Sequence, residues 1–186
     1  MAIRSLKTGQ FSRSALVGNP VIMPGSYESI ATVTVGSGGA ANVEFTSIPA
    51  TYTHLQIRGI ARTGSDQAVL VTFNGSSSTY KNHYLEGTGT SAIAGAETNS
   101  GIALYAVSVS TANTFSGFVW DILDYANTNK NKVLRALNGF DKNGTGYIDL
   151  DSGLWVDTSA ITSIKVTPTG STTFQQYSHF ALYGVN

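Results

Sequence analysis

Short runs of alternating side chains, separated by Gly, Asn, Ser and Thr, recur along most of this chain. In residues 54–62, HLQIRGIAR, Leu55 and Ile57 fall on one side while Gln56 and Arg58 fall on the other. This period of two is typical of a β-strand with one buried face. Further strand candidates are residues 28–35, 42–47, 68–73, 80–86, 102–109, 115–125, 132–137, 147–150, 161–166 and 176–185. The spacing predicts an all-β domain, an antiparallel sandwich or barrel.

Two segments need separate comment. Residues 131–137 are the one stretch compatible with a helix, but they cover less than about three turns. In the run FSGFVWDILDY, Phe118, Trp120 and Ile122 share one face. We therefore interpret residues 115–125 as a strand whose aromatic face belongs to the core.

Residues 1–27 differ from the rest of the chain. Glycines and prolines at positions 9, 18, 20, 24 and 25 interrupt any periodicity. The segment nevertheless contains six large apolar side chains, more than a purely solvated tail would carry. They are Phe11, Leu16, Val17, Val21, Ile22 and Met23. We predict an extended arm, residues 1–27, that orders against a partner, followed by a sandwich domain, residues 28–186. The alternative is that the arm packs back on its own sandwich.

Charge is sparse and unevenly distributed. Only 12% of the residues are charged, against about 25% in a typical soluble domain. The net charge is zero, but residues 1–27 contain Arg4, Lys7 and Arg13 and no acid, so the remainder carries an excess of three acids. A basic arm can dock on an acidic neighbour; an N-terminus without a partner is the alternative. Three cations are too few to indicate a nucleic-acid partner.

The chain contains no cysteine. That excludes disulfides, thiolate metal ligands and cysteine catalysis, and it fits folding in a reducing cytoplasm. No stretch approaches the 18 apolar residues expected of a membrane span, and the N-terminus lacks the apolar run of a secretory signal. We therefore expect no membrane partner.

Residues 141–149, DKNGTGYID, copy the first nine positions of a calcium-binding EF-hand loop. The twelfth position, which should be a bidentate Glu, is Ser152, and the flanking residues are not helical. An Asn-Gly pair between two strand candidates favours a tight turn. The alternative is a weak cation site made by Asp141, Asn143, Asp149 and Asp151. We predict the turn, and no metal or other cofactor.

Other motifs carry little chemistry. Residues 87–92, GTGTSA, match the dinucleotide-binding fingerprint in letters, but residues 93–101 read as a loop and no βαβ unit surrounds them. His54, His83 and His179 lie in or beside strand candidates without a catalytic or metal-binding pattern, and we interpret them as structural. Five acids have no spacing typical of a catalytic pair. They are Asp121, Asp124, Asp149, Asp151 and Asp157. We predict no catalytic residues and no enzyme activity.

Two stretches near the N-terminus resemble virion structural proteins of tailed bacteriophages, as found in phages of cyanobacteria and other aquatic bacteria. They read MAIRSLKTGQFSRSALVGNPV and YESIATVTVGSGGAANVEFTSIPATYTHLQIRGIAR. The stretches LDYANTNKNKVLRALNG and GLWVDTSAITSIKVTPTGSTTFQQYSHFALYGV resemble the same family. The resemblance implies a jelly-roll sandwich, commonly a homotrimer, exposed on a virion that assembles in the host cytoplasm. It also implies an N-terminal arm that anchors the domain.

Our leading hypothesis is a capsid-bound decoration or cement protein. The arm would dock on other virion proteins, the major capsid protein first, or tail and fibre proteins if the chain sits there. The predicted docking residues are Arg4, Lys7, Phe11, Arg13 and Leu16.

The alternative is a tail-fibre or head-fibre adhesin that binds host surface polysaccharide. The predicted glycan-binding residues are Tyr80, His83, Tyr84 and Trp155. Trp155 lies in a segment that reads as a loop, where an exposed indole can stack on a sugar ring. It can equally close the end of the sandwich, and we favour that interpretation.

Overall fold

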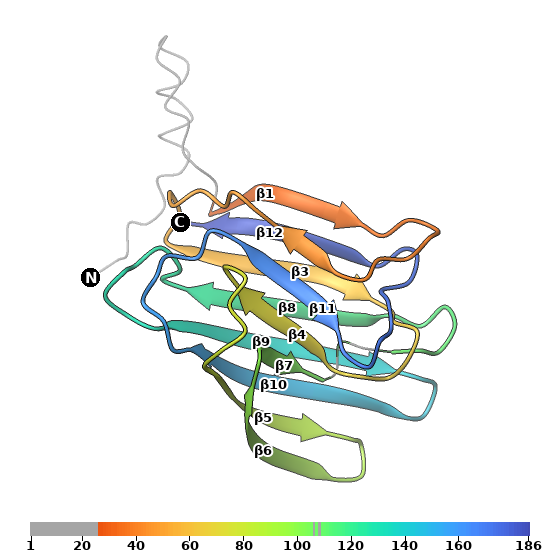
Figure 1. Ribbon diagram of the computed structural model, residues 1–186. Helices are drawn as coiled ribbons and strands as arrows, with labels where there is room; N and C mark the ends of the chain where they lie inside the picture. Colours follow the sequence, from red (N-terminus) through yellow and green to blue (C-terminus); the bar gives the residue numbers. More distant parts are fainter. Residues whose placement is uncertain (1–25, 106, 108) are drawn as a thin grey trace, which may run out of the picture.

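The computed structural model of this chain describes residues 26–105, 107 and 109–186. Within these residues every regular element is a β-strand, and all paired strands run antiparallel (Figure 1). The same residues include no helix long and apolar enough to cross a membrane. The predicted docking residues Arg4, Lys7, Phe11, Arg13 and Leu16 lie outside the described part of the chain.

The strands form a large and a small sheet. The large sheet has the spatial order β1 (Tyr27–Thr34), β12 (His179–Val185), β3 (His54–Ala61), β8 (Ser116–Leu123), β9 (Lys132–Asp141), β10 (Gly146–Trp155), β5 (Tyr80–Gly87) and β6 (Ala92–Asn99). The small sheet has the order β2 (Val43–Phe45), β11 (Ile164–Pro168), β4 (Val69–Phe73) and β7 (Ile102–Leu104).

Eight of these strands make a jelly roll. The small sheet lies in front of one half of the large sheet, which consists of β1, β12, β3 and β8 (Figure 1). The strand order in these two layers is the one produced when a chain winds two Greek keys across two sheets. The predicted jelly-roll sandwich is therefore confirmed. We call these eight strands the framework. The hairpins β5–β6 and β9–β10 are inserted between framework strands and lengthen the large sheet beyond β8; we call them the extension.

The core lies between the two sheets of the framework. Along β8, buried and partly exposed residues alternate, and Phe118, Trp120 and Ile122 point inward as predicted. The ring of Phe118 stacks on Trp120 with centroids 4.5 Å apart and lies 5.3 Å from Phe180 of β12. From the small sheet, Phe73 and its β4 neighbours close the same cluster. The face of the large sheet that points away from the small sheet is called the outer face below.

Two predictions about the extension were wrong. Residues 92–99 form strand β6, although their Ala- and Gly-rich sequence has low strand propensity. The turn at Thr88–Ser91, closed by a 3.0 Å bond from Thr88 N to Ser91 O, returns the chain along β5 in unbroken register. Strand β10 runs to Trp155, beyond the predicted end at residue 150. The strand predicted over residues 132–137 is confirmed as part of β9, which excludes the helical alternative.

Candidate functional site

Two of the four predicted glycan-binding residues are buried in the core. Trp155 is 2% exposed and ends strand β10, so its placement in a loop was wrong. Its ring stacks on Tyr80 at 6.2 Å and lies 5.7 Å from Phe73. The Phe73 amide donates a 2.8 Å hydrogen bond to the Tyr80 hydroxyl. Neither ring is free to stack on a sugar, and Trp155 packs inside the sandwich as we favoured.

The other two predicted glycan-binding residues face opposite ways. His83 is exposed on the outer face of β5. Tyr84, the next residue, points to the inner face, where its half-buried ring lies 5.6 Å from Tyr105. The structure therefore does not bring the four residues together.

The EF-hand-like segment is a hairpin turn between β9 and β10. Asp141 Oδ1 accepts a 2.6 Å bond from the Asn143 amide, and Lys142 N donates to Thr145 O at 2.6 Å. Asn143 and Gly144 adopt φ values of 61° and 109°, the left-handed region that an Asn-Gly pair tolerates. The predicted turn is confirmed. Among the described residues, no group of three His, Asp or Glu side chains is placed to hold a metal ion.

The inner face of the extension is polar where the hairpins project beyond the core. Asn138, Asp149 and Asp151 are buried there, and Asn138 Nδ2 donates to Asp151 Oδ2 at 2.7 Å. Burial, reinforced by the nearby Asp149, raises the pKa of Asp151 to about 8. Burial and Asp149 also raise the pKa of Glu86. Asp151 is therefore uncharged at neutral pH, which lets two aspartates lie together away from water.

A cleft of about 420 Å³ opens beside this cluster. Its lining includes Asp66, Glu86, Tyr105 and Lys142. Lys142 forms an ion pair with Asp66, and the Tyr105 hydroxyl donates to Glu97 Oε1 at 2.5 Å. Burial and the Glu97 carboxylate raise the pKa of Tyr105. The groups around the cleft are thus largely engaged with one another.

On the outer face, a polar row crosses the large sheet. Gln56, Asp121, Arg135, Ser152 and His83 lie opposite one another on β3, β8, β9, β10 and β5. Gln56 Nε2 donates to Asp121 Oδ1 at 2.6 Å, and Arg135 Nη2 to Asp121 Oδ2 at 2.9 Å. Partial burial opposes ionisation of Asp121, but these two donors outweigh it and lower its pKa. The framework end of the row is therefore satisfied internally.

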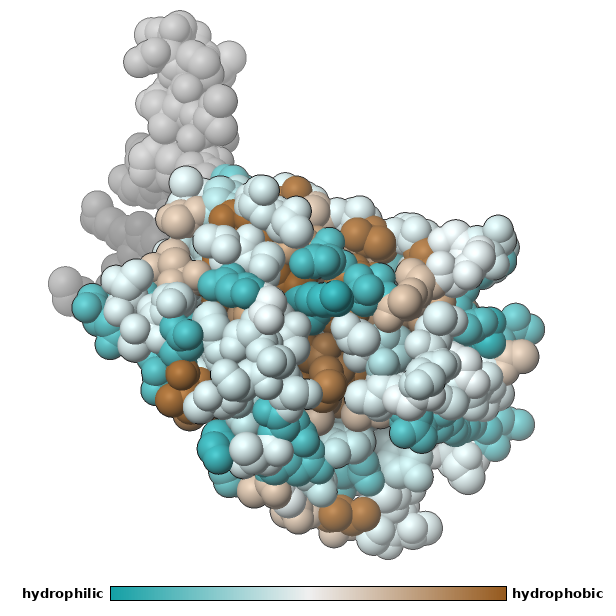
Figure 2. All heavy atoms as spheres, viewed as in Figure 1, coloured by the Kyte–Doolittle hydropathy of each residue, from teal (hydrophilic) through white to brown (hydrophobic). Residues whose placement is uncertain are grey.

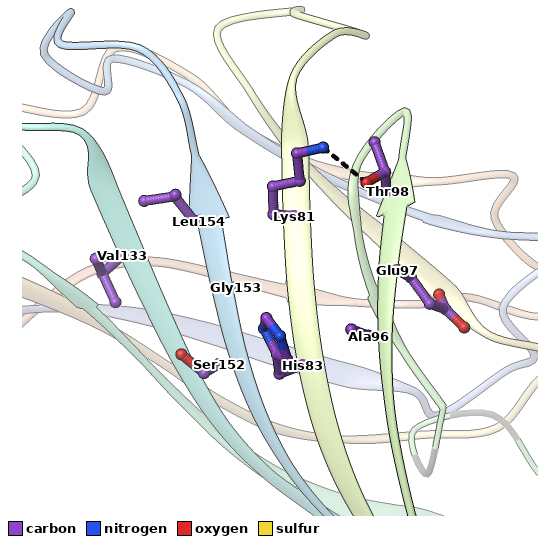
Figure 3. Close-up of a pocket in the computed structure, with 9 residues that line it drawn as sticks. All are labelled: Lys81, His83, Ala96, Glu97, Thr98, Val133, Ser152, Gly153 and Leu154. Carbon is purple, nitrogen blue, oxygen red and sulfur yellow. Dashed lines mark hydrogen bonds between the residues drawn. The ribbon is translucent and has the colours of Figure 1, made fainter.

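The extension end of the polar row opens into a shallow groove of about 580 Å³. Figure 3 shows His83 beside Ser152, Lys81 reaching to Thr98, and Glu97 turned away from the groove. Lys81 Nζ donates to Thr98 Oγ1 at 2.8 Å. Val133 and Leu154 complete the lining on β9 and β10. The groove offers a cation, an imidazole and a hydroxyl on an open surface.

Two apolar rows lie next to the polar row on the same outer face. The first joins Val119, Leu137, Leu150, Leu85 and Ala94 across β8, β9, β10, β5 and β6. The second joins Gly117, Gly139, Ile148, Gly87 and Ala92 across the same strands. Neither row contains a charged or polar side chain. We call these ten residues the extension patch.

The side chains of the extension patch are conspicuously exposed. Leu137, Leu150, Leu85 and Ile148 expose 44%, 51%, 52% and 59% of their surface. They surround a hollow of about 230 Å³ on the outer face. On the side of the molecule that carries the small sheet, by contrast, apolar residues form small separate areas in a mostly polar surface (Figure 2). The extension patch is therefore the surface feature that most needs an explanation.

Comparison of the chain with protein-family models, with curated proteins and with solved structures found no match. Sequence reasoning identified the strand that carries Leu85 and parts of those that carry Leu137 and Leu150. It missed the patch, because alternation alone does not say which of two faces is covered. The signal that was present is the sequence YIDLD, residues 147–151, in which two aspartates alternate with Ile148 and Leu150.

Proposed function

We propose that this chain is a structural protein of a tailed-bacteriophage particle, a capsid-bound decoration protein anchored by its N-terminal segment. The resemblance of its sequence to virion proteins supports this role, and the jelly roll agrees with the fold which that resemblance implies. In this proposal the chain has no catalytic function, and several copies, in the trimer that the resemblance implies, present their sandwich domains on the particle.

The observation that carries the proposal is a closed sandwich core in the described part of the chain, together with a basic N-terminal sequence. The buried cluster described for the sandwich is drawn from residues between Val35 and Leu182 and is closed between the two sheets. Residues 1–25 contain three cations and no acid and lie outside the described part of the chain. A basic segment of this kind can bind a neighbouring acidic surface.

The test is binding to capsids prepared without this chain. We expect the full chain to sediment with such capsids and a chain beginning at Ser26 to remain in solution. Arg13→Glu should weaken binding, whereas Lys130→Glu, which reverses an exposed cation on the sandwich, should not. A chain that begins at Ser26 and still decorates capsids fully would show that the arm is not the anchor.

The adhesin alternative has less support from the geometry. Tyr80 and Trp155 are enclosed in the core, and Tyr84 faces away from His83. The groove around His83 is the remaining place for a sugar. Glycan-array binding that is lost on His83→Ala would restore this alternative.

A further inference from the structure

The extension patch reverses the usual polarity of a half-buried strand. On β10, the aspartates at 149 and 151 are buried on the inner face, while Ile148 and Leu150 project from the outer face. The four large side chains of the patch expose on the order of 400 Å² of apolar surface, comparable with the largest apolar patches on soluble monomers, which are often functional. An outer face of this composition is expected to be covered.

We propose that the extension patch packs against the same patch of a second copy of this chain. The two rows contain no charge, so their partner must also present an uncharged apolar surface. The patch itself meets that requirement. Ile148 projects between Gly139 and Gly87 in its row, and a hollow adjoins it. A side chain from one copy can therefore enter the hollow of the other.

The size of the patch agrees with a weak contact. Five strands about 4.8 Å apart, with side chains of one face repeating about every 6.8 Å, give roughly 330 Å² for the two rows of the patch. Two copies would bury about 650 Å² together, which is below the range for stable interfaces and corresponds to a weak, concentration-dependent association. Sheets that pack face to face lie about 10 Å apart, a spacing that the leucines of both rows can fill.

Other occupants fit less well. Residues 1–25 would bring three cations towards Arg135 and Arg58, which border the patch. A polysaccharide would need hydrogen-bonding groups, and the two apolar rows offer no polar side chain. The contact between two patches does not depend on capsid binding through the N-terminal segment, so each can fail without the other.

The first test is sedimentation of the full chain between about 1 and 100 μM, the range in which weak to moderate interfaces associate. We expect a mass above that of one chain, rising with concentration. Leu150→Asp and Leu85→Asp should each weaken association at least tenfold, because a carboxylate would be buried without a partner. Tyr177→Asp adds the same charge at a residue that is 66% exposed and outside the patch, and it should leave association unchanged.

The second test uses the absence of cysteine in the wild-type chain. Leu150→Cys should form a covalent pair of chains under mild oxidation or with a short thiol cross-linker, since facing residues of two packed patches approach one another closely. Tyr177→Cys should not. Circular dichroism of each variant shows whether it has kept its fold. Misfolding alone would not explain a cross-link that forms at position 150 and not at position 177.

Three results would overturn the proposal. One is a wild-type chain that stays monomeric throughout the concentration range. Another is an association that Leu150→Asp and Leu85→Asp leave unchanged in folded protein. The third is a monomeric full chain whose version beginning at Ser26 does associate, because residues 1–25 would then cover the patch.

Discussion

The framework and the part of the extension that projects beyond the core share one sheet but bury opposite kinds of side chain. In the framework, β8 turns Trp120 and Ile122 inward and Asp121 outward. In the extension, β10 turns Asp149 and Asp151 inward and leaves Leu150 outside. The small sheet covers the framework, whereas it reaches β10 and β5 of the extension through β7 and through Phe73 of β4. The difference teaches that a covering layer, and not alternation alone, decides which face of a strand is apolar.

The largest expected effect is on the free energy of unfolding, when a leucine is shortened to alanine in each of the two regions. Leu55 in β3 is fully buried in the framework core, while Leu137 in β9 projects from the extension patch. We expect Leu55→Ala to lower the free energy of unfolding by about 2–5 kcal/mol, through lost burial and a cavity. Leu137→Ala should change it by less than about 0.5 kcal/mol in the monomer. Urea denaturation at about 1 μM measures both, and equal losses would erase the distinction between the regions.

This comparison also shows how far the sequence could go. Alternation in residues 115–125 correctly predicted that Phe118, Trp120 and Ile122 enter the core, because the small sheet lies over them. The same rule would send Ile148 and Leu150 inward and the aspartates outward, which is the reverse of the structure. The covering layer comes from strands distant in sequence, so local pattern could not supply it.

The candidate site was predictable only in part, for related reasons. Residues 92–99 became a strand because β5 offered a paired edge, although their own propensity is low. The four aromatic and histidine residues chosen for glycan binding were selected by type. The structure encloses Tyr80 and Trp155 and turns Tyr84 from His83. Which side chains converge depends on the register of β5 with β10, and no short motif encodes it.

An effect of intermediate size is expected on the pH dependence of stability, and it arises from the buried aspartates. Because the folded pKa of Asp151 is about 8, well above its ordinary value, the folded protein holds this proton between pH 4 and 8 while the unfolded chain releases it. Stability from this group is therefore fully present below about pH 4 and is lost as the pH rises to 8. Each pH unit in this window corresponds to up to about 1.4 kcal/mol.

Replacing the acid by its neutral counterpart tests this. Asp151→Asn keeps a group that can accept from Asn138 Nδ2 but has no proton to lose. We expect it to flatten the fall in stability between pH 4 and 8 and to exceed the wild type at pH 8 by at least about 1 kcal/mol. Thermal unfolding at several pH values measures the slope. A slope unchanged in the variant would mean that the inner face of the extension does not hold a neutral aspartate.

The smallest effect on the stability of the monomer is expected from a substitution in the extension patch. The difference from the wild type should grow with protein concentration, which makes it informative. Leu150→Ser removes a side chain that is already half exposed, so at about 1 μM its midpoint of thermal unfolding should stay near that of the wild type. At 100 μM, self-association adds stability to the wild type by mass action, and the midpoint should rise. The variant lacks the apolar contact and should show little rise, whereas Tyr177→Ser should follow the wild type. If the unfolding midpoints of all three proteins depended on concentration in the same way, the exposed leucines of the extension would have no role in association. The contrast between the two regions would then be a property of the folded monomer alone.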